Sequence, residues 1–397
     1  MNKSPTIFRR GVRVSDPAEP AFTYMKFWQR RLPNLVGGAL SEPMSRVIGA
    51  DRVRNLLNHT AGSRVFWTEQ RVMPAFGNRL GVHGFLLAPG GCEWAIARHG
   101  GCTFCPFQDE VDRYVGDLPL DHHEFLALFR AGFGTMQRHV DWVGYFTAGS
   151  ATNRGEIPAK TMYKIAEIVS QAPRVKALRV ESRVQHMDPD YLGELSAVLR
   201  RKPVMLDIAI GLETQDDGIR NKLLNKGMSK RQFETAVEAA KALGVRITAY
   251  VMLKGHWALG EGFAIEECLR SVAYAFGVGV DEVQLQPLYI SPDGREMHQR
   301  FLKQECKPPW LWSVVEVLKR SLDQGPVIVG PWDGELPTPI AVPQNCERCT
   351  PALMASLVAW RQTLDPRVWD DSNLPGCACH EQWRGEVSAT QASPALG

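Results

Sequence analysis

Six apolar, β-branched runs recur between residues 82 and 290, and helical patterns separate them. This alternation is typical of parallel βαβ units. Six units are too few for a complete eight-fold barrel, so we expect an α/β fold, a partial (β/α)6 barrel. Its chemistry should lie at the carboxyl ends of the strands. The runs are Val82–Ala88, Val140–Thr147, Ala177–Ser182, Met205–Glu213, Arg246–Leu253 and Glu282–Ile290.

Two of the intervening helices have clear ends. Asp188 is an N-cap followed by a proline at the first helical position. Ser229 and Gln232 form a capping box, and Gly244 ends that second helix. Apolar residues recur at helical spacing in both segments: Leu192, Leu195 and Leu199 in the first, and Phe233, Val237, Ala240 and Leu243 in the second.

The segments outside this region have a different pattern. Residues 1–80 alternate apolar pieces with Arg/Pro-rich turns and are predicted to be a helical N-terminal extension. The barrel is assigned to residues 81–290. Residues 291–385 form a Cys-rich C-terminal extension with Pro/Trp-rich segments. Residues 386–397 have a composition typical of a disordered tail.

Composition excludes several classes of protein. The net charge is +3, from 46 basic and 43 acidic residues, which gives no global signature of nucleic-acid binding. The first residues carry basic side chains but no apolar core of a signal peptide, so we expect a cytoplasmic location and no membrane contact. Nine cysteines in short spacings then favour metal or redox chemistry over disulfides.

Three of these cysteines follow the first predicted strand, among glycines. Cys92, Cys102 and Cys105 have the spacing C-x9-C-x2-C, with the aromatic Phe104 before the third. Cubane iron–sulfur clusters normally take four Cys ligands, so a local set of three leaves one iron open to another ligand. A zinc site is the alternative, and His99 is then a candidate fourth ligand.

This motif resembles that of the radical S-adenosylmethionine (SAM) superfamily, whose fold is a TIM-like partial barrel. The resemblance implies a [4Fe-4S] cluster on the three cysteines and SAM on the open iron. It also implies reductive cleavage of SAM to a 5′-deoxyadenosyl radical, which abstracts a hydrogen atom from the substrate. An electron donor such as flavodoxin or ferredoxin is then required.

Later segments resemble one branch of that superfamily, the radical SAM subunit of archaeosine synthase (RaSEA), and more distantly the elongator catalytic subunit. The resemblance covers about residues 65 to 385. It implies carbon–nitrogen bond scission on a lysine-bearing 7-deazaguanine in tRNA. The matching stretches include GGCTFC, YFTAGSATNRGEIP, RVESRVQHMD, IAIGLETQDDGIRNKLLNKG, AYVMLKG, PPWLWSVVEVLKR, NCERC and CACHEQW.

The same resemblance assigns cofactor contacts to successive strand ends. Besides Phe104, these are Thr147, Ala148, Gly149 and Ser150 near the SAM amino group; Glu181, Ser182 and Arg183 near its carboxylate and ribose; Gly211, Leu212, Glu213 and Thr214 near SAM and substrate; and Lys254, Gln286 and Pro287 on the adenine side. Any one of these residues has the alternative of a solvated or ion-paired loop position. Lys226, Lys230 and Arg231 are interpreted as a solvated helix start, with contact to a phosphate as the alternative.

A second set of cysteines lies near the C-terminus. Cys346, Cys349, Cys377 and Cys379 supply four thiolates to a tetrahedral zinc or to a second [4Fe-4S] cluster, and the spacing does not separate the two. We slightly favour the cluster, because a redox enzyme has a use for it. His380 and Cys306 are spare ligands whose role is open. Cys268 is expected to be a buried helix residue.

Three functions therefore compete. The first is the RaSEA-like reaction, although the chain shows no basic RNA-binding face in its composition and no separate tRNA-docking domain, so a partner subunit would supply both. The second is radical chemistry on a free nucleoside or other small molecule, with sulfur insertion if the second site holds a cluster. The third is a zinc-binding interaction module, which leaves the strand-end motifs unexplained.

Overall fold

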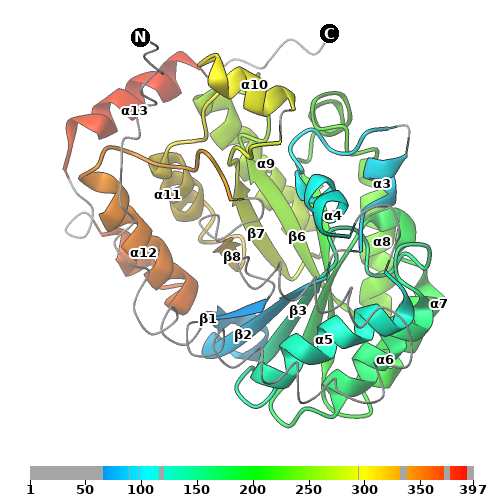
Figure 1. Cartoon of the computed structure of the whole chain (residues 1–397). Helices are drawn as coiled ribbons and strands as arrows, with labels where there is room; N and C mark the ends of the chain where they lie inside the picture. The colour runs from blue at the N-terminus through cyan, green and yellow to red at the C-terminus, as the bar shows by residue number, and fades with distance from the viewer. Residues whose placement is uncertain are drawn as a thin grey trace, which may run out of the picture.

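A curled, eight-stranded sheet forms the centre of the molecule. The computed structural model describes residues 66–88, 90–97, 99–115, 120–293, 295–330, 338–370 and 376–390. Within these ranges the strands lie in chain order from β1 to β8. β1 is antiparallel to β2, and every later neighbouring pair is parallel. Helices cover the outer face of the curled sheet (Figure 1).

The strands are β1 (Phe66–Met73), β2 (Arg79–Leu87), β3 (Trp142–Phe146), β4 (Ala177–Ser182), β5 (Met205–Glu213), β6 (Arg246–Leu253), β7 (Glu282–Pro287) and β8 (Val327–Val329). The α-helices are α3 (Glu93–Ile96), α4 (Phe107–Val115), α5 (His122–Met136), α6 (Ala159–Ser170), α7 (Pro189–Leu199), α8 (Lys230–Ala242), α9 (Glu261–Val278), α10 (Glu296–Leu302), α11 (Leu311–Arg320), α12 (Cys349–Thr363) and α13 (Ala378–Ala389). A π-helical turn, Ile219–Leu223, follows β5. No described helix has the length and apolar character of a membrane span.

All six predicted strands are present, and β4, β5 and β6 have the predicted bounds. The helix ends are also confirmed. Asp188 accepts a hydrogen bond from the backbone N–H of Asp190 at the start of α7, and Ser229 and Gln232 form both bonds of a capping box on α8. Gly244 has a φ of +66° just after α8, a conformation that favours glycine.

The sheet is larger than the six predicted strands. β1 lies within residues 1–80, which were expected to be helical, and only residues 66–80 of that segment are among those described. The centre of β1, Thr68 to Arg71, is polar and therefore lacks the apolar pattern that predicts a buried strand. Arg71 is nevertheless buried, because it takes part in an ionic network. β8 has only three residues, too few for a periodic signal. At the other end, α13 continues to Ala389, inside the segment expected to be disordered.

Charged side chains fill the barrel near the amino ends of the strands. Arg179 of β4 contacts Asp207 of β5 at 2.7 Å and Glu282 of β7 at 2.9 Å. Arg71 adds a contact to Glu282 at 3.3 Å. Burial alone raises the pKa of Glu282, but Arg179 and Arg71 lower it to about 2. Because this network occupies one end of the barrel, the chemistry is expected at the other end.

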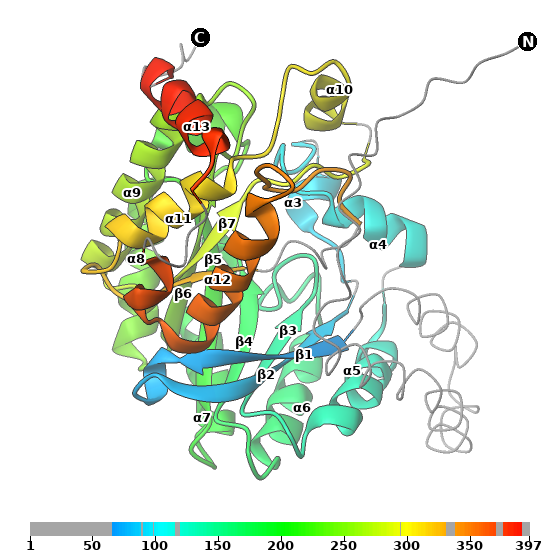
Figure 2. The same ribbon diagram turned by 90° about the vertical axis from the view of Figure 1, so that its left-hand side faces the viewer.

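The last helices extend the structure on the side of β8. Figure 2 shows α11, α12 and α13 on this side, with α10 at the upper right above α3 and α4. The backbone N–H groups of Gly262 and Phe263, at the start of α9, donate to Thr390, which follows α13. The C-terminal segment is therefore attached to the barrel rather than separate from it.

Candidate functional site

The three N-terminal cysteines lie in a loop that follows β2, which we call the cluster loop, residues 90–105. The backbone N–H of Gly90 donates to the carbonyl of Thr147 at 2.9 Å, so the loop begins against the end of β3. Cys92 precedes α3, and its N–H donates to Oε1 of Gln108 at 2.8 Å. Gly101 has a φ of +79°, and a Cβ there would lie 3.1 Å from Ala95, so this turn requires glycine.

Cys102 is buried, whereas Cys92 and Cys105 are half-buried, and all three are free thiols. Burial raises the pKa of Cys102, while Lys226 and Arg183 act in the opposite direction. Burial, together with Cys102, raises the pKa of Cys105 to about 12. The two cations suit a group that binds iron as a thiolate. Within the described part of the chain, the sulfur atoms of these three cysteines do not all lie within 4.8 Å of one another. This spacing is compatible with a cubane cluster, because each thiolate then binds a different iron.

The loop that follows β5 holds the cluster loop in place. Asn225 donates from Nδ2 to the carbonyls of His99 and Gly101, both at 2.7 Å. Thr103 donates from Oγ1 to the carbonyl of Leu223 at 2.9 Å. Trp94 donates from Nε1 to the carbonyl of Asn225 at 2.8 Å. Sequence reasoning missed these contacts, although the Asn-Lys-Gly turn that begins at Asn225 was visible as a turn signal.

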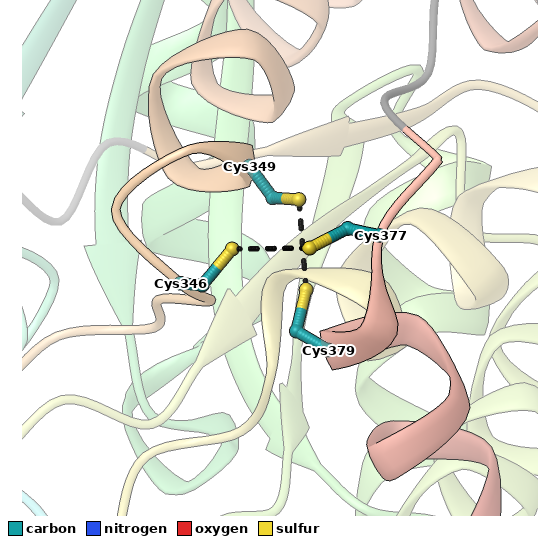
Figure 3. Close-up of side chains that lie close together, drawn as sticks. All are labelled: Cys346, Cys349, Cys377 and Cys379. Atoms are coloured by element: carbon teal, nitrogen blue, oxygen red, sulfur yellow. Dashed lines mark hydrogen bonds between the residues drawn. The ribbon is translucent and has the colours of Figure 1, made fainter.

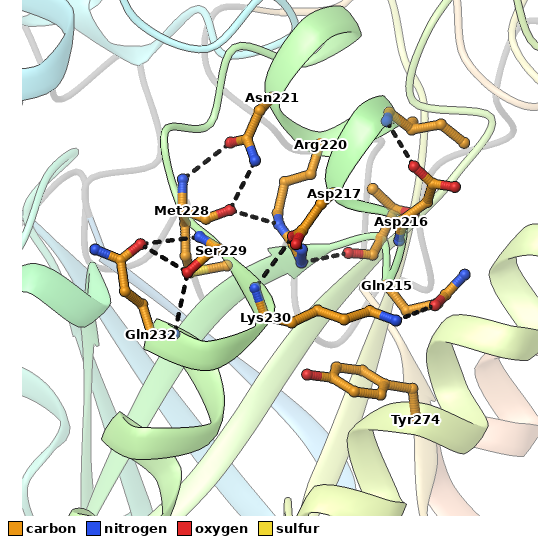
Figure 4. Close-up of polar contacts among 12 residues, drawn as sticks. Gln215, Asp216, Asp217, Arg220, Asn221, Met228, Ser229, Lys230, Gln232 and Tyr274 are labelled. Carbon is orange, nitrogen blue, oxygen red and sulfur yellow. Dashed lines mark hydrogen bonds and ion pairs between the residues drawn. The ribbon is translucent and has the colours of Figure 1, made fainter. Parts of the chain in front are cut away.

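A buried arginine fixes the shape of that second loop (Figure 4). Arg220 is fully buried and donates to the carbonyls of Thr214 at 2.9 Å and Met228 at 3.0 Å. Asn221 bonds to the carbonyl and N–H of Met228, both at 2.9 Å. Lys230 donates to Oε1 of Gln215 at 2.6 Å. Hydrogen bonds within the loop after β5 therefore hold its shape, independently of its contacts with the cluster loop.

The end of β3 approaches the cluster loop closely. A Cβ on Gly149 would lie 2.0 Å from the carbonyl oxygen of Gly91, so only glycine fits there. Glu156 accepts hydrogen bonds from the N–H of Ser150 and, at 2.8 Å, from the N–H of Glu93. One buried carboxylate therefore ties the segment after β3 to α3. Burial raises the pKa of Glu156, and the two N–H groups oppose that shift.

The ends of β4 and β6 meet inside the barrel. Tyr250 donates to Glu181 at 3.0 Å, and burial raises the pKa of Glu181 to about 7. Ser182 lies 2.5 Å, oxygen to oxygen, from Thr152. The guanidinium of Arg183 lies 4.6 Å from the centre of the Trp94 ring. The three residues predicted on β4 thus lie beside the cluster loop or in the barrel interior.

Glu213, at the end of β5, forms an ion pair with Lys226 at 2.7 Å. The interpretation of Lys226 as a solvated residue was therefore wrong: its side chain is largely buried, and it lies 5.9 Å from the Phe104 ring centre. Burial lowers the pKa of Lys226, but Glu213 and Cys102 together raise it above its ordinary value. A Cβ on Gly211 would collide with both charged groups, so this glycine makes room for the pair.

The remaining predicted contacts lie at the ends of β6 and β7. Lys254 is buried and pairs with Glu261 of α9 at 2.8 Å. Gln286 lies on β7, where a Cβ on the neighbouring Gly330 would be 2.9 Å from its Oε1. Arg295, before α10, donates to the carbonyl of Cys105 at 2.6 Å and to Asp109 at 3.0 Å. Arg295 was not found from the sequence.

The four C-terminal cysteines form a compact group (Figure 3). All four sulfurs lie within 4.8 Å of one another, with 3.6 Å between Cys346 and Cys377 and 3.5 Å between Cys349 and Cys379. Trp312 of α11 donates to Sγ of Cys379 at 3.4 Å. The group can therefore hold a metal, as the sequence predicts.

The two spare ligands lie outside this group of described residues. His380 stacks on Trp383 with 5.1 Å between ring centres. Cys306 is buried in a separate apolar cluster with Ile290 and Met297. Cys268 is buried in α9, as expected for a packing residue.

No protein-family model matches the sequence. The chain is 29% identical over 315 residues to archaeosine synthase subunit beta of Methanosarcina acetivorans, covering 75% of this chain and 83% of that protein. It is 31% identical over 182 residues to archaeosine synthase subunit beta of Thermococcus kodakarensis, covering 44% of this chain and 53% of that one. Among solved structures, methylornithine synthase has a TM-score of 0.46 at 15% identity, covering 92% of this chain and 94% of that chain.

Proposed function

We propose a reaction for this chain from the premise that it is a radical SAM enzyme related to archaeosine synthase subunit beta. When bound, a [4Fe-4S] cluster and SAM supply a 5′-deoxyadenosyl radical that abstracts a hydrogen atom from the substrate. The thiolates of Cys92, Cys102 and Cys105 hold this cluster. The positive charges of Lys226 and Arg183 beside Cys102 support that role, because they offset the negative charge of the thiolates.

In this proposal, residues at the carboxyl ends of the parallel strands would hold SAM. The support is that the proposed contacts come from the loop after β2 and from the ends of β3 to β7, which meet at one edge of a curled parallel sheet. The buried pairs Glu181–Tyr250 and Glu213–Lys226 line that edge from within. The proposed contacts are Phe104, Thr147, Gly149, Ser150, Glu181, Ser182, Arg183, Gly211, Glu213, Lys254 and Gln286.

The substrate we propose is a lysine-bearing 7-deazaguanine in tRNA. Abstraction of a hydrogen atom from the lysine portion, followed by scission of its carbon–nitrogen bond, would release the lysine fragment as an alkene. The nitrogen would stay on the base as a radical, and one further electron and one proton would convert it to the amidine. The observation that carries this proposal is the similarity to archaeosine synthase subunit beta along most of that protein's length. A flavodoxin or ferredoxin supplies the electron, and a partner subunit contributes to tRNA binding.

For the C-terminal cysteines we propose a single zinc ion. Four thiolates bound to one tetrahedral ion at about 2.3 Å are about 3.8 Å apart, whereas a cubane separates its thiolates onto different irons. The sulfur–sulfur distances of 3.5 and 3.6 Å support the single ion. Such a site stabilises the packing of α12 and α13 rather than moving electrons.

The test is SAM cleavage by the anaerobically reconstituted protein. The Cys102→Ala variant should lose reductant-dependent 5′-deoxyadenosine formation, and Cys306→Ala, a buried cysteine outside both groups, should retain it. Metal analysis of the wild type should give about four irons and one zinc per chain. Undiminished cleavage by Cys102→Ala contradicts the cluster assignment, and about eight irons without zinc contradict the zinc assignment. Conversion of a free nucleoside but not of tRNA contradicts the proposed substrate.

A further inference from the structure

Basic residues concentrate at the amino ends of three neighbouring strands. The helix-to-strand connections 137–141, 171–176 and 200–204 hold six Lys and Arg residues but only one acidic residue, Asp141. The whole chain has 46 basic and 43 acidic residues, so this segregation does not reflect a general excess of positive charge. We call these six residues the basic rim: Arg138, Arg174, Lys176, Arg200, Arg201 and Lys202.

The topology places the three connections side by side. β3, β4 and β5 are adjacent and parallel, and Trp142 pairs with Ala177, which pairs with Met205. The N–H of Lys176 donates to the carbonyl of Asp141, and the N–H of Met205 donates to the carbonyl of Lys176, both at 2.8 Å. Neighbouring strands are about 4.8 Å apart, so the three connections lie side by side. Lys176, in the middle connection, is half-buried, with its ammonium 5.2 Å from the centre of the Phe76 ring.

Internal pairing neutralises only part of this surface. Arg174 pairs with Asp141 at 3.1 Å yet keeps half of its side chain exposed, and Arg200 donates to the carbonyl of Leu243. Arg138 and Lys202 are exposed and take part in no ion pair within the described residues. Helix dipoles favour cations only in the last turn of a helix. Arg174 and Lys202 lie beyond the ends of α6 and α7, so this effect does not account for them.

We propose that the basic rim binds the phosphate backbone of an RNA. This inference rests on the proposed function, in which the modified base belongs to a tRNA. Lysine and arginine side chains on an exposed surface bind phosphates without reading the sequence, and so they position an RNA rather than select it. Because the basic rim lies at the amino ends of the strands, it contacts a part of the RNA distant from the base at the catalytic edge.

The experiment compares two double variants in full-length, reconstituted protein. Arg201→Ala/Lys202→Ala removes two cations of the basic rim, and Lys319→Ala/Arg384→Ala removes two exposed cations elsewhere as a matched control. Affinity for a transcribed tRNA is measured over a series of salt concentrations. The rim variant should bind on the order of tenfold more weakly, and its slope of log affinity against log salt should be shallower by about 2. The control should match the wild type, and all three proteins should cleave SAM equally.

If the two variants have equal affinity and equal slope, the proposal that the basic rim binds RNA is wrong, and the proposed function is unaffected. A wild type that cleaves SAM but binds no tRNA at low salt overturns both the basic rim and the tRNA substrate. The basic rim is also wrong as an RNA site if its substitution weakens binding only to an acidic partner protein. Circular dichroism of each variant checks that these exposed substitutions leave the fold intact.

Discussion

Asn225 fixes the cluster loop from a distance of more than a hundred residues along the chain. It has a φ of +50° and donates to the carbonyls of both His99 and Gly101. Asparagine tolerates this left-handed conformation better than most residues, and its amide supplies two donors. The loss of both hydrogen bonds should lower the free energy of unfolding by about 1–3 kcal/mol. It should also make the backbone just before Cys102 more mobile.

We therefore expect Asn225→Gly to release iron to a chelator several-fold faster than the wild type under anaerobic conditions. Glycine accepts the positive φ, so this variant isolates the two hydrogen bonds from backbone strain. Asn225→Ala adds that strain and should release iron faster still. Iron retention in the glycine variant equal to that of the wild type would show that the side chain does not hold the loop.

Glu181 makes stability depend on pH. Burial raises its pKa to about 7, above the value of about 4.3 for an unfolded glutamate. A raised carboxyl pKa contributes stability that is complete below the unfolded pKa and is lost as pH rises through the folded one. Between pH 5 and pH 8 this loss amounts to about 2–3 kcal/mol.

Replacing Glu181 by glutamine should remove this dependence while keeping an acceptor for Tyr250. The free energy of unfolding, measured by urea titration, should rise relative to the wild type as pH increases from 5 to 8. Other groups titrate in both proteins, so the difference between the two curves is the informative quantity. A constant difference across that range would refute the raised pKa.

At the scale of elements, the start of α9 joins the barrel edge to the C-terminal helices. Glu261 is buried, pairs with Lys254 at the end of β6, and accepts hydrogen bonds from the N–H of Trp310 at 2.9 Å and from Ser313. Ser313 in turn accepts from Trp383 of α13 at 2.8 Å. The C-terminal segment that carries the four cysteines and a predicted SAM contact therefore share one network.

Glu261→Gln should destabilise the protein by about 3–5 kcal/mol, because it leaves the ammonium of Lys254 buried without a counter-charge. The matched double variant, Lys254→Met/Glu261→Gln, removes both charges and should recover much of that loss. Urea unfolding of the metal-loaded proteins measures both values. If the double variant is as unstable as the single one, the unpaired charge is not the cause.

For the whole molecule, local patterns were sufficient where one segment forms one element. The apolar runs of β4 to β6 and the caps of α7 and α8 gave correct bounds, because strand and helix periodicities are properties of neighbouring residues. They failed for β1, since its buried Arg71 is polar and donates a hydrogen bond to Glu282, more than two hundred residues away. The ion pair of Lys226 with Glu213 was also missed, because these residues meet only when the loop after β5 folds back on the strand.

The sequence by itself determined the parallel βαβ order, the three-cysteine loop and the four cysteines near the C-terminus, because spacing and periodicity are written along the chain. Only the tertiary structure decided which groups meet. It gathered four sulfurs within the reach of one ion, attached the tail to α9, and aligned three basic connections into one surface. Charge pairing and metal geometry depend on distances in space, and the order of residues does not contain those distances.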